Sequence, residues 1–237
     1  MTLSPPLGPP RYRLRTPDLS KDTDACARVQ VSAFGHNHWP FWQKGHHRLA
    51  TDFVRVMGML GDLNFVAEDA DTGRIVGLLF AGYPMDGKAV RRALSSIVKL
   101  LWFGFVGLWV WKGETFRHGI RFLRAIYRLA KVHPSYEPHA EIIEFAVHEE
   151  AQRKGVGKLL MDAAVRELHR RGAKQVVLMT DSTMSWTFYE RYGFARVRDV
   201  DFGATYEIAT GSSSEHGYSY ELDVPKRVAE MDNMPER

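Results

Sequence analysis

The chain has 237 residues, of which 45% are apolar and 25% charged, the usual balance of a soluble globular protein with one sizeable core. This composition excludes wholly disordered, collagenous and coiled-coil classes. Lys and Arg number 32 against 28 for Asp and Glu, so the formal net charge is +4, which does not by itself indicate a nucleic-acid partner.

The ends of the chain predict a location and a domain boundary. The opening MTLSPPLGPP lacks the cationic end and the apolar run of a secretory signal, and the single Cys26 cannot form a disulfide within the chain, so we expect a cytoplasmic protein. Four prolines without periodicity predict a flexible lead over residues 1–10. One domain is then expected over residues 11–224, followed by a C-terminal tail at 225–237.

Apolar periodicity and turn residues predict an alternation of strands and helices. The first half is predicted to form a strand, two helices and a hairpin, over residues 12–16, 18–34, 42–60, 64–68 and 74–83. The second half is predicted to form strand, helix, strand, helix and a closing antiparallel pair, over residues 140–148, 158–171, 175–180, 185–191, 196–202 and 218–224. This order favours an α/β fold with local parallel pairing.

Residues 84–134 do not fit the alternation and predict a helical insertion. An apolar run at 100–111 is too short to cross a bilayer, which takes about 20 residues. Within 91–133, nine basic residues accompany Glu114 alone, and five of them are spaced as one helix face: Arg117, Arg121, Arg124, Arg128 and Lys131. A solvated face, a lid, a homodimer contact and contact with a membrane surface are the alternatives.

The most informative stretch is VHEEAQRKGVGK at 147–158, which leads from a strand directly into a helix. Gly155 and Gly157 allow the backbone to approach an anion closely, and the first helical turn offers N–H donors and a positive dipole end. Neither a P-loop nor a dinucleotide fingerprint is present. The stretch therefore predicts a pyrophosphate-binding turn, with full charges supplied by Arg153, Lys154 and Lys158.

Two motifs resemble one family. Gln152-Arg-Lys-Gly155-Val-Gly157 resembles the [QR]-x-x-G-x-[GA] motif of the GNAT family of N-acetyltransferases, and FYERYGF at 188–194 resembles its F-Y-x-x-x-G-F signature. The order of elements from residue 11 to 224 is similar to that of the family. The resemblance implies a mixed, mostly antiparallel twisted sheet flanked by helices, and acetyl-CoA as co-substrate without a metal. The length and the insertion resemble the puromycin-acetyltransferase branch.

The resemblance also implies a set of cofactor-binding residues. Main-chain N–H groups would hold the pyrophosphate of acyl-CoA, from Gln152 through Arg153, Lys154, Gly155, Val156, Gly157 and Lys158. The strand residues Phe145, Ala146 and Val147 would pair with pantetheine as though it were another strand. Ser182 stands where many relatives carry Asn, and Ser185 stands where Ala is usual, so both are candidate contacts to the cofactor.

Tyr189 falls where the family places a hydroxyl near the thioester sulfur. It would protonate the departing thiolate. The thiolate is a fair leaving group because the pKa of the corresponding thiol is near 8.5. Packing of its helix is the alternative role for this side chain.

Acetylation of an amine also needs a base, because an ammonium nitrogen has no lone pair with which to attack the thioester. Glu141 lies eleven residues before Gln152, the register at which GNAT histone acetyltransferases carry a Glu and arylalkylamine acetyltransferases a His. Strand alternation predicts that Glu141 shares a side with Phe145, and that Glu144 lies on the opposite side. We therefore expect Glu141 to be the base, with His139 and Glu144 in reserve and an ion pair to an Arg as the alternative.

A histidine-rich segment lies between the first two predicted helices. The resemblance implies that this segment borders the acceptor site, as it does in the GNAT family. Its spacing matches no zinc pattern, so it predicts either an acceptor pocket for an aromatic or apolar amine or surface packing, through His36, His38, His46 and His47.

Together these patterns predict an enzyme that transfers acetyl from acetyl-CoA to the amine of a small molecule by direct attack in a ternary complex. The alternatives are a protein lysine or N-terminal acetyltransferase, and a non-catalytic module that binds acyl-CoA or a membrane surface.

Overall fold

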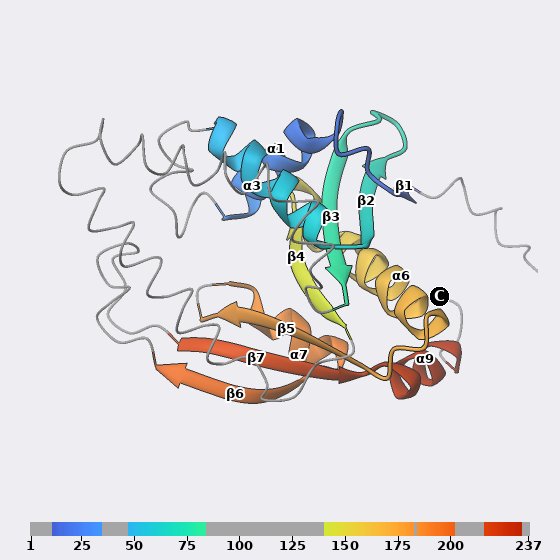
Figure 1. The fold of residues 1–237 in the computed structure, drawn as a ribbon. Coiled ribbons are helices and arrows are strands. Elements are labelled where there is room, and N and C mark those ends of the chain that lie inside the picture. Colours follow the sequence, from blue (N-terminus) through green and yellow to red (C-terminus); the bar gives the residue numbers. More distant parts are fainter. Residues whose placement is uncertain (1–10, 35–46, 84–139, 183, 202–215, 234–237) are drawn as a thin grey trace, which may run out of the picture.

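The computed structural model describes residues 11–34, 47–83, 140–182, 184–201 and 216–233 (Figure 1). The predicted insertion at 84–134, together with His36, His38, His46 and His139, lies outside these ranges. His47 begins a described helix, but its side chain is not described.

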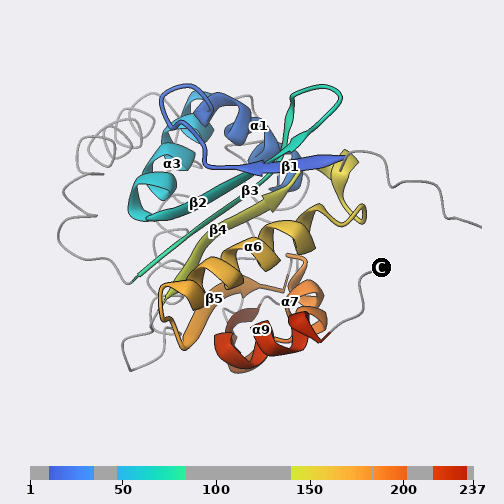
Figure 2. The ribbon, with the colours of Figure 1, turned by 90° about the vertical axis from the view of Figure 1, so that its right-hand side faces the viewer.

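The described residues form one sheet of seven strands in the order β1-β2-β3-β4-β5-β7-β6 (Figures 1 and 2). Neighbouring strands pair antiparallel except β4 and β5, which are parallel. The mixed, mostly antiparallel sheet is thereby confirmed. Its strands are β1 (Tyr12–Arg15), β2 (Leu63–Asp69), β3 (Ile75–Gly82), β4 (Glu141–Val147), β5 (Gln175–Asp181), β6 (Ala195–Asp201) and β7 (His216–Asp223).

Helices cover both faces of the sheet (Figure 2). One face carries α1 (Thr23–Phe34) and α3 (His47–Leu60), and the other carries α6 (Val156–Arg170) and α9 (Val224–Asp232). The short helices η1 (Glu149–Ala151) and α7 (Trp186–Tyr192) follow β4 and β5. Within the described ranges, no helix has both the length and the apolar character needed to cross a membrane.

The core has two layers that meet at β3. Leu78 and Phe80 are fully buried in the cluster beneath α1 and α3, whereas Leu79 and Ala81 are fully buried in the cluster beneath α6. Because side chains alternate along a strand, β3 is buried on both faces, which explains its continuous apolar sequence.

The C-terminal segment differs from the expected tail. Residues 224–232 form α9, which begins at Asp223, whose carboxylate accepts the Lys226 N–H at 2.9 Å, and continues through Pro225 in its first turn. Val228 and Met231 are buried in the same cluster as α6. The folded domain therefore extends beyond residue 224.

Candidate active site

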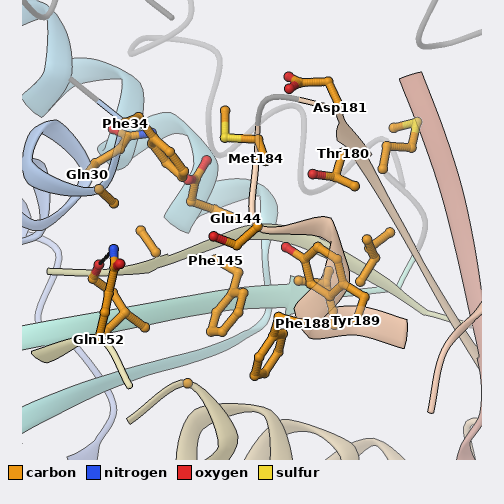
Figure 3. A pocket seen from close by; sticks show the side chains of 18 of the residues that line it. Gln30, Phe34, Glu144, Phe145, Gln152, Thr180, Asp181, Met184, Phe188 and Tyr189 are labelled. Atoms are coloured by element: carbon orange, nitrogen blue, oxygen red, sulfur yellow. Dashed lines mark hydrogen bonds between the residues drawn. The ribbon is translucent and has the colours of Figure 1, made fainter. Parts of the chain in front are cut away.

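The site lies where β4 and β5 part. These strands pair only through Glu141↔Val177 and Ile142↔Leu178, and beyond that point residues 144–147 of β4 have strand partners only in β3 among the described residues. A cavity of about 610 Å³ occupies the opening, with walls from α1, α3, β4, β5, α7 and the start of α6 (Figure 3). One edge of β4 therefore faces this cavity rather than a neighbouring strand.

A β-bulge in β4 changes which of its side chains share a face of the sheet. Pairing with β3 passes from Phe80↔Glu144 to Ala81↔Ile142, so Ile143 is an extra residue on β4. Ile142 packs beneath α6 but Ala146 packs beneath α1 and α3, although simple alternation would put both on one face. Alternation from Ala146 puts Glu144 toward α1 and Phe145 toward α6 and α7. The bulge reverses the side of the residues before it, so Glu141 lies on the side of Glu144, and the prediction that it shares a side with Phe145 is wrong.

Two glycines shape the start of α6 for different reasons. Gly155 has φ +87°, a left-handed conformation that favours glycine, and a Cβ there would meet no atom within 4 Å. Gly157 is constrained by space instead, because a Cβ would lie 3.3 Å from the Phe145 ring. Because neither position carries a side chain, an anion in the cavity can approach the backbone at the start of α6 closely.

The loop before α6 is tied to β4 and carries positive charge. The Gln152 side chain donates to the Val147 carbonyl oxygen at 3.1 Å, which holds the turn against the strand end. Arg153, itself at φ +58°, and Lys158 line the cavity, and Lys158 forms an ion pair with Asp162 one turn along α6. This end of the cavity suits a polyanion.

Tyr189 lies on α7 within a group of aromatic rings. Its ring centroid is 5.6–6.2 Å from those of its aromatic neighbours, Phe145, Phe188, Phe194 and Tyr220. Burial, followed by the negative charges of Glu144 and Asp181, raises the pKa of the Tyr189 hydroxyl above its usual value. The hydroxyl, which Figure 3 shows directed toward β4, therefore keeps its proton at neutral pH.

The register of Tyr189 is fixed by the end of its helix. The N–H of Phe194 donates to the Tyr189 carbonyl oxygen at 3.0 Å, and the N–H of Gly193 donates to that of Glu190 at 3.1 Å. This is a Schellman motif, and Gly193 supplies its left-handed residue with φ +115°. The helix expected over 185–191 is thereby confirmed as α7, which ends at Gly193.

Glu144 lies on the α1 side of the cavity, near Gln30 and Phe34 (Figure 3). Burial raises the pKa of its carboxyl group to about 7, and a hydrogen bond from the Gln30 side chain partly offsets that rise. Asp181, on β5, adds a second carboxyl group to the lining. The cavity is therefore acidic toward α1 and β5 and basic at the start of α6.

Comparison with known proteins identifies the family. The acetyltransferase (GNAT) family matches residues 38–194. The chain belongs to the GNAT family. GNAT enzymes use acetyl-CoA as co-substrate, and the free edge of β4, the open turn at Gly155 and the nearby cations fit this donor.

This chain matches only part of the length of its curated GNAT relatives. Mycothiol acetyltransferases of Renibacterium salmoninarum and Geodermatophilus obscurus are 28% and 32% identical over 141 and 124 residues, which cover 57% and 49% of this chain. The chain spans about two fifths of these relatives, 40% and 38%. They support the family but not specifically its puromycin-acetyltransferase branch.

Solved GNAT structures share the fold. A GNAT family acetyltransferase from Desulfovibrio desulfuricans superposes with a TM-score of 0.53 at 17% identity, covering 90% of this chain and 99% of its own. The Drosophila melanogaster polyamine N-acetyltransferase gives 0.55 at 15% identity with the same coverage. At such identities the likeness shows the fold alone.

The structure brings most of the predicted site residues to the cavity. Its lining includes Phe145, Ala146, Val147, Gln152, Arg153, Gly155, Gly157, Lys158, Ser185 and Tyr189. Four predicted residues are not part of that lining: Glu141, Lys154, Val156 and Ser182.

The reasons for these four exceptions are local. Glu141 lies at the start of β4, where that strand still pairs with both neighbours, whereas Glu144 lies beyond the pairing with β5 and lines the cavity from the α1 side. Val156 is fully buried in the core, and Lys154 is exposed. The Ser182 hydroxyl accepts the His216 N–H at 3.1 Å and so joins β7 to the end of β5.

Sequence reasoning missed the side of the cavity that faces away from α6, which comes from α1, α3, β5 and the segment before α7. The residues concerned are Gln30, Ala33, Phe34, Phe53, Met179, Thr180, Asp181 and Met184. One signal was present, because Gln30 follows Cys26 by four residues and so lies on the buried face of α1. A polar residue at such a position indicates a buried partner or a ligand.

Proposed function

We propose that this protein transfers acetyl from acetyl-CoA to the amine of a small molecule, by direct attack within a ternary complex. The observation that carries the proposal is that Glu144 and Tyr189 line one cavity together with the start of α6 and the free edge of β4. A base, an acid and two backbone binding elements thus meet in a single site.

Donor binding would use the backbone of two elements. N–H groups at the start of α6, with Arg153 and Lys158, would hold the pyrophosphate, and the edge of β4 at 145–147 would hydrogen-bond to the amides of pantetheine. Bound in this way, acetyl-CoA supplies an activated acetyl group as a thioester.

Glu144 would act as the base. A carboxyl group with a pKa near 7 accepts a proton from the ammonium directly or through water, which frees the nitrogen lone pair. That lone pair forms the new C–N bond while the C–S bond breaks and its electron pair passes to sulfur. The second amine proton passes, directly or through water, to the departing thiolate, so that the products are the amide and the CoA thiol, with the first proton held on Glu144.

Tyr189 would stabilise the departing sulfur. Because its pKa is raised above that of a thiol, complete proton transfer from the phenol to the thiolate is uphill. Its main contribution is therefore a hydrogen bond that grows stronger as negative charge develops on sulfur.

The apolar lining of the proposed acceptor side, which faces away from α6, supports a small molecule rather than a protein. Phe34, Phe53 and Met184 line this side and form apolar walls around the acids. The matching curated relatives are also named for a single compound, as mycothiol acetyltransferases.

The test combines calorimetry with free-thiol release. The purified chain is expected to bind acetyl-CoA and to release thiol only when an amine is added, with an acetylated product found by mass spectrometry. An amine panel and a peptide panel run in parallel, and release with peptides alone would replace the proposal by the protein-acetylating alternative. Binding of acetyl-CoA without release from either panel would contradict the proposed catalysis.

A further inference from the structure

Gln30 carries a buried polar atom that no neighbouring residue within the described ranges satisfies. It lies on α1, is only 3% exposed and lines the cavity beside Glu144 (Figure 3). Its side-chain amide hydrogen-bonds to the Glu144 carboxyl group. The other end of the amide, Oε1, has no hydrogen-bond partner among the residues that the structure describes.

The orientation of this amide is fixed by Glu144. A flip would place the Gln30 carbonyl oxygen against a carboxylate, where two acceptors repel each other. While Glu144 is ionised, the form in which it can act as a base, the N–H therefore stays on Glu144 and Oε1 keeps an unused acceptor position. Buried polar atoms usually have partners, so an orphan in the wall of a cavity points to a ligand that donates a hydrogen bond.

We propose that Gln30 binds the acceptor amine: Oε1 accepts one of its N–H groups while Glu144 takes the proton that leaves. This inference rests on the proposed function and deepens it, since it names the substrate class. Once one proton has gone to Glu144, a primary amine still has two N–H groups. One can stay on Gln30 while the lone pair turns to the thioester. A secondary amine retains a single N–H and brings an extra substituent to the same corner.

The rest of the acceptor side indicates what carries the amine. Phe34 on α1, Phe53 on α3 and Met184 before α7 surround the acidic end of the cavity with apolar surface. A flat or aliphatic group next to the nitrogen would bury that surface. The class of acceptor is therefore a primary amine on an apolar body.

Two probes test this assignment: 2-phenylethylamine and its N-methyl derivative. Gln30→Met removes both polar ends of the side chain at similar length. Gln175→Met is the matched control, because the Gln175 amide also donates to a carboxylate, Glu221 at 2.7 Å, but lies outside the cavity lining. Calorimetry with the enzyme–CoA complex and steady-state kinetics are measured for each variant.

The wild type is expected to prefer the primary amine at least tenfold in kcat/KM. In Gln30→Met the affinity for 2-phenylethylamine should fall at least tenfold and the preference over the N-methyl amine should collapse, while acetyl-CoA affinity stays within twofold. Gln175→Met should change neither quantity.

Failure of this assignment is distinguishable from failure of the proposed function. Acetylation that continues in Gln30→Met with unchanged affinity and preference would overturn the role of Gln30 and leave the function intact. Amine binding that weakens in Gln30→Met without any acetyl transfer in the wild type would support Gln30 and overturn the function. If 2-phenylethylamine neither binds nor reacts, the assigned substrate class is wrong.

Discussion

Two effects shift the pKa of Glu144 in opposite directions. Burial disfavours the charged carboxylate, whereas the Gln30 amide favours it, and burial is the larger effect, so the pKa is about 7. A group balanced in this way changes its protonation within the range in which an enzyme operates, which is the property that a general base requires.

Replacing Glu144 should therefore change the pH dependence of activity. For Glu144→Gln we expect kcat/KM at neutral pH to fall by about two orders of magnitude, with loss of the rise near pH 7. Glu141→Gln is the control, since Glu141 is not part of the cavity lining and should keep the wild-type profile. A reversed pattern between the two variants would restore Glu141 as the base.

The same carboxyl group should make stability depend on pH. Its pKa is raised from 4.5 to about 7 by folding, so the folded state binds more protons and the free energy of unfolding falls as pH rises from 4.5 toward 7. Above pH 7 the loss levels off, at about 3 kcal/mol or less. Urea unfolding at several pH values should show that the free energy of unfolding of Glu144→Gln rises relative to that of the wild type between pH 4.5 and 7. A constant difference between the proteins would contradict the burial of this carboxyl.

Tyr189 allows a comparison within one helix. Tyr189→Phe should lower kcat by about tenfold to a hundredfold, the value of one hydrogen bond to a developing charge, with acetyl-CoA affinity nearly unchanged. Tyr192→Phe is the matched control: its hydroxyl donates to Asp162 at 2.9 Å, outside the cavity lining. Rapid-mixing measurements of the chemical step check both variants, and equal values of kcat would exclude the role of Tyr189.

At the scale of elements, the turn into α6 joins a backbone requirement to a binding role. Gly155 and Gly73 both have left-handed φ values, +87° and +67°, and a Cβ at either would meet no atom within 4 Å. Alanine at each position should therefore cost a similar amount of stability, about 1–2 kcal/mol. Of these two glycines, only Gly155 lies in the cavity lining.

This pair separates strain from binding. Gly155→Ala and Gly73→Ala should lower the free energy of unfolding by similar amounts, but only Gly155→Ala should weaken acetyl-CoA binding, which calorimetry measures. Equal affinities in the two variants would show that the turn before α6 does not hold the cofactor.

Sequence patterns predicted the helices and strands well where local chemistry decides them. The helix stops at Gly172 and Gly193 both have left-handed φ values, as the sequence indicates. The bulge at Ile143 has no such local signal, because it depends on pairing with β3, which is distant in sequence. Alternation without the bulge therefore put Glu141 on the side of Phe145, and the family register before Gln152 favoured it as the base, which left Glu144 in reserve.

At the scale of the whole molecule, the C-terminal helix belongs to the core. Arg227 stacks over the Tyr192 ring with its guanidinium carbon 4.4 Å from the ring centre, and Met231 is 8% exposed beneath α6. The sequence did not reveal this helix, since it is short and only half apolar. Its place against α6 follows from the way β7 ends, which depends on tertiary contacts.

The contribution of this helix can be measured at one residue. Met231→Ala should lower the free energy of unfolding by about 2 kcal/mol or more, because it leaves a cavity in the core. The exposed Lys226, on the same helix, serves as control, and its alanine variant should stay within about 0.5 kcal/mol of the wild type. Urea denaturation distinguishes them, and a neutral Met231→Ala would mean that α9 is dispensable.

The acceptor side of the cavity was also beyond the reach of sequence patterns. Gln30, Phe53 and Asp181 come from three elements that only the folded sheet brings together. The donor side, by contrast, depends on one continuous stretch from β4 into α6, and its motif was therefore visible in the sequence.

The join between β4 and β5 has a wider consequence. Every additional residue pair between these strands would contribute backbone hydrogen bonds and make the sheet more resistant to unfolding, yet it would also consume the space in which chemistry takes place. Selection of variants for thermal stability alone would tend to extend the pairing between β4 and β5 and so close the cavity. The most robust version of the fold would then be an inert one.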